Sequence, residues 1–376
     1  MPRLLILCEY PTLLGGERSM LATLEAVGAA DFDVNVAAPP AGPLAAAIGQ
    51  HAARHVPWHT HDDAGERFPL ERLRADLDAM IADVRPDLVH ANSLSTSRIA
   101  GPVVVKRGVA GVGHLRDIVK LAPQAMIDVN AHRRLLAVSR AVRDFHIHQE
   151  IDATKCAIVY NGIDLDEFQP GTATGYLHRE LQLPTASQLV AMIGQIGLRK
   201  GTDVALAAAW QVAAEVPDVH WLVVGERTSN KREAHEFEAL VREIAGESPL
   251  SGRVHFLGTR TDVPQILVEC DLLVHAARQE PLGRVLLEAA ACGVAIVATD
   301  VGGTREIFTG ESECGLLVPS DNRSALAEAI LAVLRNLDLR LKLGRAARRR
   351  AEQAFDIRDA AARLIQQYQS ALASSG

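Results

Sequence analysis

Two glutamates eight residues apart have the spacing to hold a ligand on both sides of a charged linker. Pro281 follows Glu280 and suits the first turn of a helix, because it lacks an N–H that would go unpaired there, and Gly283 lets a ligand approach the backbone. Free N–H groups at a helix start attract a diphosphate. Eight residues of helix span about 12 Å and turn the two carboxylates to different faces. We therefore expect Glu280 in the loop before the helix and Glu288 on the helix, near ribose hydroxyls. Two solvated glutamates are the alternative.

A cationic pair, Arg199 and Lys200, lies in the glycine-rich segment that begins at Gly194. This segment follows a predicted strand. Negative charge builds on a diphosphate leaving group as the bond to it breaks, so fixed cations beside it stabilise the transition state. We therefore assign Arg199 and Lys200 to catalysis. Exposed cations at the start of a helix are the alternative.

The first half of the chain has two further candidate segments. Gly15 and Gly16 link a predicted strand to a predicted helix, where the backbone can come near a ligand, with a plain turn as the alternative. The segment lacks the G-x-G-x-x-G pattern of dinucleotide sites. His114 ends another predicted strand, at the sheet edge where ligands bind, which makes it a candidate catalytic residue as well as a candidate structural histidine. Asp117 is a second candidate in that segment.

Short apolar runs alternate with longer helical patterns along the chain, which predicts parallel, doubly wound sheets. The predicted strands are residues 4–8, 34–38, 88–91, 111–114, 135–138 and 157–159, then 189–193, 220–224, 254–257, 272–275, 295–298 and 315–318. The predicted helices are residues 17–28, 70–84, 95–107 and 140–150, then 202–215, 231–245, 262–269, 283–291 and 324–334.

This alternation of strands and helices occurs in both halves of the chain, so we predict an α/β protein of two Rossmann-like domains facing each other across a cleft. Residues 161–186 are rich in Gly, Pro, Thr and Asp and form the predicted connection. We assign residues 1–170 to the first domain and 171–356 to the second. The segment 339–372 is predicted to be helical, and a last helix at about 357–374 is expected to pack back on the first domain.

Composition excludes several functional classes. Hydrophobic residues make up 48% of the chain, and a net charge of −7 argues against nucleic-acid binding, which needs clustered Lys and Arg. The 5 cysteines are scattered, so we expect buried, reduced thiols and a cytoplasmic protein. The initial apolar run is too short for a signal peptide, and no stretch reaches the roughly 20 apolar residues of a membrane span. Any membrane contact would be peripheral, at the inner face.

Two Asp-x-Asp pairs resemble a metal clamp but occur in unsuitable places. Asp76 and Asp78 lie inside a predicted helix, and Asp164 and Asp166 lie in the connection. Cations and helix starts are available for a diphosphate, so we expect no metal. The basic run at 345–350 is expected to pair with nearby acidic residues rather than to bind a membrane.

Taken in order, the motifs of the second half closely resemble retaining glycosyltransferases of family 4, which have the GT-B fold. These proteins carry a Glu-x7-Glu motif, a strand similar to residues 293–299 and a Gly-Gly-x-x-Glu loop similar to Gly302–Glu306. The resemblance extends to most of the chain and includes residues 138–139, 161–164, 194–201, 223–226 and 253–258.

The resemblance implies a role for each matching residue. Glu288 would hold the donor ribose and Glu280 the transferred sugar, while Leu282, Gly283 and Arg284 would cradle the sugar and diphosphate. Lys200 matches the Lys that stabilises the leaving diphosphate. The corresponding Arg position is Gln195 in this chain, and Arg199 is the candidate replacement. Gly15 and Gly16 would lie against the donor phosphates, and His114 against a distal hydroxyl of the donor sugar.

We therefore expect a retaining, metal-independent glycosyltransferase with no cofactor besides its nucleotide-sugar cosubstrate. A UDP-sugar is favoured over GDP- or ADP-sugars because UDP is common in the family. The acceptor is a small molecule, a lipid-linked sugar or a glycan, and the oligomeric state stays open. A nucleotide-sugar epimerase and a non-catalytic binding subunit are the alternatives, the second because of Gln195.

Overall fold

Short apolar runs in the first half of the chain form a seven-stranded parallel sheet in the order β3-β2-β1-β4-β5-β6-β7. Its central strands are buried on both faces, which explains their nearly continuous hydrophobic sequence. The strands are β1 (Arg3–Leu7), β2 (Asp33–Ala38), β3 (Arg54–Pro57), β4 (Leu88–Ala91), β5 (Ala110–Leu115), β6 (Arg134–Ala137) and β7 (Cys156–Ile158).

Helices cover both faces of this sheet. Alternate residues of β1 point to opposite faces, so Leu5 packs in a cluster with Leu77 and Ile99 of two helices, while Ile6 packs with Leu364 of the last helix. The helices are α1 (Gly15–Leu21), α2 (Leu24–Ala29), α3 (Pro43–Ile48), α4 (Leu70–Val84), α5 (Leu94–Arg107), α6 (Pro123–Asn130), α7 (Arg140–Ile147) and α16 (Ile357–Ala373).

The second half forms a six-stranded parallel sheet in the order β10-β9-β8-β11-β12-β13. Its strands are β8 (Gln188–Ile193), β9 (Val219–Val224), β10 (Val254–Gly258), β11 (Leu272–His275), β12 (Ala295–Thr299) and β13 (Leu316–Val318). Its helices are α8 (Tyr176–Glu180), α9 (Thr202–Glu215), α10 (Arg232–Gly246), α11 (Val263–Glu269), α12 (Arg284–Ala291), α13 (Thr304–Phe308), α14 (Arg323–Leu334) and α15 (Leu337–Ala354), with a short 3₁₀ turn, η1 (Leu198–Lys200).

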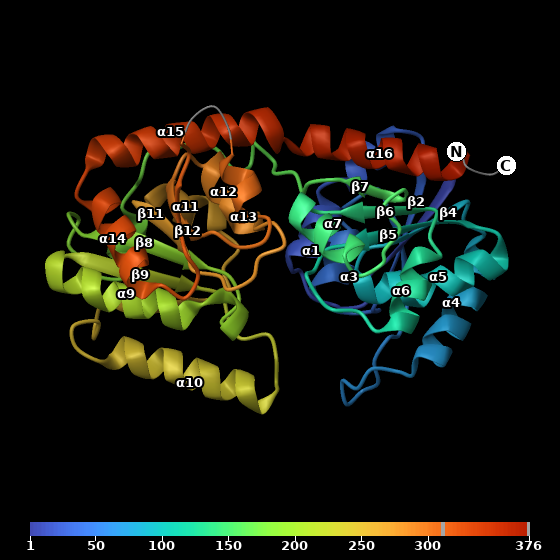
Figure 1. The fold of residues 1–376 in the computed structure, drawn as a ribbon, viewed down its shortest axis with the longest axis horizontal. Helices are drawn as coiled ribbons and strands as arrows, with labels where there is room; N and C mark the ends of the chain where they lie inside the picture. Colours follow the sequence, from blue (N-terminus) through green and yellow to red (C-terminus); the bar gives the residue numbers. More distant parts are fainter. Residues whose placement is uncertain (310–312, 374–376) are drawn as a thin grey trace. The chain divides into compact units, whose positions relative to one another are not determined.

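This computed structural model describes residues 1–309 and 313–373, which form two compact units (Figure 1). The first unit comprises Met1–Gly162 together with α16, and the second comprises Ile163–Asp356. The predicted helical segment 339–372 is two helices, because the chain leaves the helix at Phe355 and Asp356. α15 packs on α12 and β12 in the second unit, and α16 packs on β4, β5 and α2 in the first.

Several local predictions were wrong. The predicted helix 17–28 is divided at Ala22 and Thr23 into α1 and α2. The short elements β3, α3, α6 and α8 were not predicted. Cys156 is partly exposed, whereas the other four cysteines are buried, and all five are free thiols.

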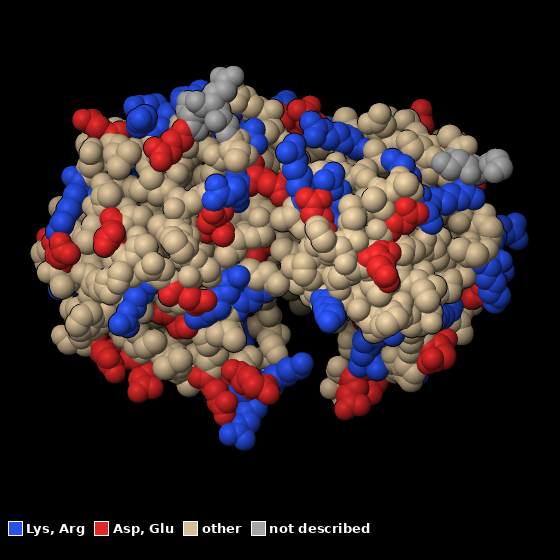
Figure 2. Space-filling view, viewed as in Figure 1, with Lys and Arg blue, Asp and Glu red and all other residues tan. Residues whose placement is uncertain are grey.

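The charges on the described surface and the hydropathy of the described helices bear on binding to nucleic acid and to membranes. Figure 2 shows acidic and basic side chains mixed over the face in view. In the described residues, no helix is both long enough and apolar enough to cross a bilayer. Within the basic run, Arg348 pairs with Glu352 and also donates to the carbonyl oxygens of Phe168 and Ala291, so its charge serves contacts inside the second unit.

Candidate active site

Each sheet has one place where ligand binding is expected from topology. From β1 the chain adds β2 and β3 on one side and then β4 on the other, and from β8 it adds β9 and β10 on one side and then β11 on the other. Between such strands the following loops diverge and leave a crevice at the carboxyl edge, where doubly wound sheets bind their ligands. The predicted site residues follow these strands.

In the second unit, the loops after β8 and β11 bring three titratable side chains together. Lys200 Nζ lies 2.6 Å from Glu280 Oε2, and His275 Nε2 lies 2.9 Å from the same oxygen. His275 is the last residue of β11, and Glu280 lies five residues later in the loop before α12. All three are shielded from solvent, since the side chains of Lys200, Glu280 and His275 are 17%, 7% and 4% exposed.

The charges in this cluster follow from its contacts. Burial alone would raise the pKa of Glu280, but the charge of Lys200 and the hydrogen bonds from His275 and Lys200 outweigh burial and hold this pKa below its ordinary value. Burial lowers the pKa of His275, with the charge of Lys200 opposing protonation and Glu280 favouring it. The cluster therefore holds an ammonium, a carboxylate and a neutral imidazole, whose Nε2–H donates to the carboxylate.

Arg278 holds the loop that carries Arg199 and Lys200. Its guanidinium lies 2.7 Å from carboxylate oxygens of both Asp203 and Asp321 and donates to the carbonyl oxygen of Leu198 at 2.8 Å. Its backbone N–H donates to the carbonyl oxygen of Arg199. Two loops from different strands are thus tied together at the backbone, which fixes the position of the cations they carry.

Glycine is required at two turns of this site. Gly201 has φ 64°, and a Cβ there would lie 1.9 Å from the carbonyl oxygen of Ala276. Gly283 has φ 103°, and a Cβ there would lie 2.6 Å from Leu286 Cδ1. Both conformations strain any other residue. At Gly201 the loops after β8 and β11 therefore approach one another more closely than a residue with a side chain allows.

The helix after Glu280 begins later than predicted. Gly283 is the N-cap and α12 starts at Arg284, so the expectation that Pro281 occupies the first helical turn was wrong. The expectation that Glu280 lies in the loop and Glu288 on the helix is confirmed. Glu288 is mostly buried and its Oε1 accepts from Arg284 Nε at 2.8 Å, one helical turn away.

The remaining residues of this loop pair lie close by. Gly194 is the first residue after β8, and its N–H donates to Val224 O. Gln195 Oε1 accepts from Thr228 Oγ1 at 2.9 Å, so its amide is used within the β8 and β9 loops. Arg199 Nη1 donates to Gln279 O at 3.2 Å, beside Glu280. Leu282 is buried. Arg199, and not Gln195, therefore brings a cation to the loop that holds Glu280.

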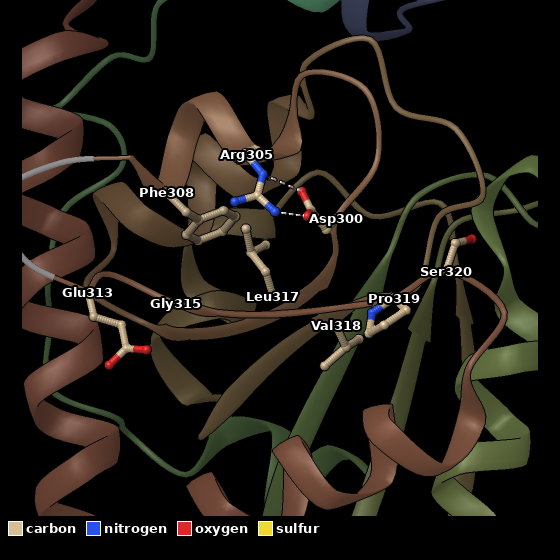
Figure 3. Close-up of a pocket in the computed structure, with 9 residues that line it drawn as sticks. All are labelled: Asp300, Arg305, Phe308, Glu313, Gly315, Leu317, Val318, Pro319 and Ser320. Carbon is tan, nitrogen blue, oxygen red and sulfur yellow. Dashed lines mark hydrogen bonds and ion pairs between the residues drawn. The ribbon is translucent and has the colours of Figure 1, made fainter.

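Two hollows lie near these loops. A small cavity of about 20 Å³, enough for about one water, is lined by residues that include Lys200, His275 and Gln195. A cavity of about 740 Å³ is lined by residues of α13, β13 and the segments beside them, and Asp300 and Arg305 in its lining form an ion pair (Figure 3). The larger cavity contains none of the predicted site residues. The Gly303 N–H nevertheless donates to Glu280 O at 2.9 Å, so the turn after β12 supports the Glu280 loop.

In the first unit, the carboxyl edge carries Gly15, Gly16 and a buried polar network. Gly15 and Gly16 are the first residues of α1. Asn92 follows β4 and donates to Gly16 O at 3.4 Å. Arg116 follows β5 and donates to Asn92 O and Asn92 Oδ1 at 2.9 and 2.8 Å. The guanidinium is held by neutral amide oxygens, and burial lowers the pKa of Arg116 to about 10.

His114 lies within β5 rather than after it, as the fifth residue of the strand, and is buried. Its Nδ1 lies 3.2 Å from Nε2 of His90, and its own Nε2 has no hydrogen-bond partner among the described residues. Asp117 is exposed, and its backbone carbonyl oxygen accepts from His146. The structure thus places His114 in a buried contact with His90, whereas the Asp117 side chain is exposed.

The two Asp-x-Asp pairs have structural contacts. Asp78 is bound by Arg107 and Lys106 on the surface of α4, and Asp164 Oδ1 accepts from the N–H groups of Asp166 and Glu167. In the described part of the chain, no group of three or more His, Cys, Asp or Glu side chains could hold a metal ion.

Sequence reasoning missed His275, Arg278 and Arg116. The signal for His275 was present, because a titratable residue at the end of an apolar strand points to the ligand-binding edge. Arg278 and Arg116 act through partners in other loops, so nothing in their own segments indicates their contacts.

Comparison with protein families matches both units. Residues 14–167 match the family described as glycosyltransferase family 4, and residues 176–350 match the family described as glycosyl transferases group 1. Together these segments include all the predicted site residues.

Two curated relatives align with part of the chain. A lipopolysaccharide core biosynthesis mannosyltransferase, LpsB of Rhizobium meliloti, is 33% identical over 178 residues, which is 47% of this chain and 50% of that protein. A D-inositol 3-phosphate glycosyltransferase of Corynebacterium jeikeium is 32% identical over 233 residues, which is 60% of this chain and 54% of that protein. The chain thus spans about half the length of these relatives.

Solved structures align over nearly the whole chain. Anabaena HepE (Alr3699) in complex with UDP-glucose superposes with a TM-score of 0.84 at 22% identity, over 98% of this chain and 100% of that one. A sucrose-phosphate synthase from Thermosynechococcus elongatus gives a TM-score of 0.81 at 20% identity, over 100% of both chains. At these identities the likeness shows a shared fold.

Proposed function

We infer that this chain belongs to the family 4 glycosyltransferases of group 1 and has their GT-B fold. From this premise we propose that it transfers a sugar from a nucleotide-diphosphate donor to an acceptor hydroxyl with retention of configuration. The observation that carries the proposal is the cluster of Lys200, Glu280 and His275 at the switch point of the second sheet. A cation and a carboxylate in direct contact can bind a ligand that carries both phosphate and hydroxyl groups, because the cation binds phosphate and the carboxylate accepts from hydroxyls.

The second unit is the proposed donor site. The diphosphate binds at the start of α12, where the backbone of Leu282, Gly283 and Arg284 cradles it together with the sugar. Glu288 accepts hydrogen bonds from the ribose hydroxyls, and Gly194 lets the phosphates approach the turn after β8. Glu280 accepts hydrogen bonds from the transferred sugar, because its second carboxylate oxygen is not used by Lys200 or His275.

The leaving diphosphate needs positive charge. Lys200 has three N–H donors and gives one to Glu280, so two remain for phosphate oxygens. Because Glu280 offsets the charge of Lys200, a second cation is needed, and Arg199 is the candidate because its Nη1 contacts Gln279 O, beside Glu280. These two side chains and the backbone N–H groups stabilise the diphosphate, so we propose that no metal is required.

Retention follows from attack on the face that the diphosphate leaves. The bond between sugar and phosphate breaks first, which gives an oxocarbenium-like sugar and a diphosphate. The acceptor oxygen then bonds to the sugar carbon on the same face, and a phosphate oxygen takes the acceptor's proton. The first unit is the proposed acceptor domain, with Gly15, Gly16 and His114 in the roles that the family resemblance implies.

A UDP-sugar is the proposed donor. HepE, whose fold this chain shares, binds UDP and UDP-glucose, and the LpsB and D-inositol 3-phosphate relatives are named as sugar transferases. We propose a polyhydroxylated acceptor, either a sugar of a glycan or lipid-linked chain or a small cyclitol, and the names of these relatives support it.

Thermal-shift screening of the purified protein with UDP, GDP, ADP and their sugars tests the donor, followed by product analysis with and without candidate acceptors. We expect one nucleotide to raise the melting temperature and its sugar to be transferred, with slow hydrolysis when no acceptor is present. Interconversion of donor sugars without an acceptor would indicate an epimerase. Neither transfer nor hydrolysis would indicate a binding subunit.

A further inference from the structure

Three side chains from distant parts of the first unit form one hydrogen-bonded line. Tyr368 Oη lies 2.7 Å from His90 Nδ1, and His90 Nε2 lies 3.2 Å from His114 Nδ1. The line begins on α16, crosses β4 and ends on β5 at His114 Nε2, which has no partner among the described residues. Tyr368, His90 and His114 are 0%, 1% and 3% exposed, so no bulk water takes part.

Strand register explains why the two histidines meet. His90 pairs with Val112 across the parallel ladder between β4 and β5, and side chains two residues apart on a strand point to one face. His114 is two residues beyond Val112, so it is the diagonal neighbour of His90 on the face that α16 covers. Tyr368 reaches that face because α16 packs across β4 and β5.

Both imidazoles are neutral. Burial lowers the pKa of His90 to about 3, and the charge of Arg116 adds to the effect. Burial and the same guanidinium hold the pKa of His114 well below its ordinary value. A neutral imidazole has one N–H donor and one acceptor nitrogen, so the hydrogen bond at one nitrogen decides what the other can do.

Two proton arrangements fit a line of this kind, and the phenol selects between them. A phenol oxygen is a good hydrogen-bond donor and a poor acceptor relative to an imidazole nitrogen. Tyr368 therefore donates to His90 Nδ1. His90 must then donate from Nε2 to His114 Nδ1, which leaves the proton of His114 on Nε2.

We propose that Tyr368 and His90 are positioning residues that hold His114 in the Nε2–H tautomer, so that it donates a hydrogen bond to a hydroxyl oxygen of the substrate. The role of His114 toward substrate rests on the proposed function; the tautomer itself does not. Tyr368 on α16 thus acts on the substrate through His90 and His114.

The tautomer is measured directly by long-range ¹H–¹⁵N correlation spectra of the full-length, ¹⁵N-histidine-labelled protein, with signals assigned from His90→Gln and His114→Gln. We expect both His90 and His114 to be protonated at Nε2 in the wild type. In Tyr368→Phe, which keeps the ring that packs against Phe32, we expect His90 and His114 to shift toward the Nδ1–H form. A His114 protonated at Nδ1 in the wild type, or unchanged tautomers in Tyr368→Phe, would overturn the proposal.

Kinetics supply the second readout. We expect Tyr368→Phe to lower kcat/KM for transfer roughly three- to tenfold while the Kd for UDP stays at the wild-type value. Tyr176→Phe is the control, because it also removes a phenol hydrogen bond, the partly buried one to Asp262, but lies in the second unit. Equal kcat/KM for Tyr368→Phe and wild type would contradict the proposal. If no donor is turned over by the wild type, the proposed function fails, and the spectra still decide the tautomer.

Discussion

Lys200 and Glu280 are 80 residues apart in the sequence, yet Lys200 Nζ lies 2.6 Å from Glu280 Oε2. The contact exists because β8 and β11 are neighbours at the switch point of the second sheet, and their loops open at the same edge. His275, at the end of β11, contacts the same Glu280 oxygen, and Arg278 holds the Lys200 loop through Leu198 O. The contact joins two motifs that the sequence presents separately.

Breaking this contact on one side should destabilise the protein more than removing both charges. Lys200→Met leaves a buried carboxylate without its cation and should lower the free energy of unfolding by about 3 kcal/mol. Lys200→Met combined with Glu280→Gln should cost less, because no buried charge is left unpaired. Urea unfolding followed by fluorescence of the buried Trp221 measures both. Equal losses for the single and double variants would show that the pair does not act as described.

Stability should fall as the pH drops below about 6.5, the ordinary pKa of histidine. The pKa values of His90 and His132 are lowered to about 3 and about 4 in the folded protein, so the unfolded chain binds more protons than the folded one between those values and 6.5. The stability that the neutral forms provide is complete above pH 6.5 and is lost as the pH falls through that window.

The variant His132→Gln isolates one of these groups. It should reduce the slope of unfolding free energy against pH between about 4 and 6.5 by up to about 1.4 kcal/mol per pH unit. Unfolding in urea at a series of pH values measures the slope, and His59→Gln, at an exposed position, is the control. The same slope in His132→Gln and wild type would contradict the burial argument.

Gly201 and Gly197 offer a matched pair in one loop. A Cβ at Gly201 would meet the carbonyl oxygen of Ala276 with φ at 64°, whereas a Cβ at Gly197 would meet nothing within 4 Å. Gly201→Ala should therefore lower the free energy of unfolding by about 2 kcal/mol or more and weaken donor binding, and Gly197→Ala should do neither. Comparable melting temperatures for the two variants would show that the loops are not held at this distance.

Arg199 should carry the charge that Gln195 lacks. Arg199→Met should lower kcat about tenfold to hundredfold, because the leaving diphosphate loses one of its cations. Adding Gln195→Arg to Arg199→Met should restore part of the loss, since residue 195 lies in the same loop after β8. Steady-state transfer rates of the two variants measure this. Wild-type kcat in Arg199→Met would remove Arg199 from the proposed catalytic set.

Prediction succeeded for every strand except β3, because most parallel strands are buried and leave continuous apolar runs, whereas β3 has no buried residue. It failed where local signals were weak or competed with tertiary structure. The division between α1 and α2 occurs at Ala22 and Thr23 without Gly or Pro, and the Thr23 hydroxyl donates to Met20 O, which satisfies the backbone locally. Pro281 was placed in a helix that Gly283, at φ 103°, prevents from starting there.

The site was predictable in its parts but not in its contacts. Glu280, Lys200 and His114 follow or end strands, so their place at the carboxyl edges could be inferred. Strand order cannot be read from periodicity, so the contact of Lys200 with Glu280, and the line from Tyr368 to His114, required the structure. Tyr368 in particular belongs to an amphipathic helix in which it has the appearance of an ordinary core residue.

Glu288 gives the most direct test of the donor site. Isothermal titration of UDP into the wild type, Glu288→Ala and Glu236→Ala compares two glutamates that each pair with an arginine four residues earlier on a helix, one at the proposed site and one on the surface of α10. We predict that Glu288→Ala raises the Kd at least about tenfold through loss of the ribose hydrogen bonds, and that Glu236→Ala leaves it unchanged. An unchanged Kd in Glu288→Ala would contradict the assignment of the donor to the start of α12.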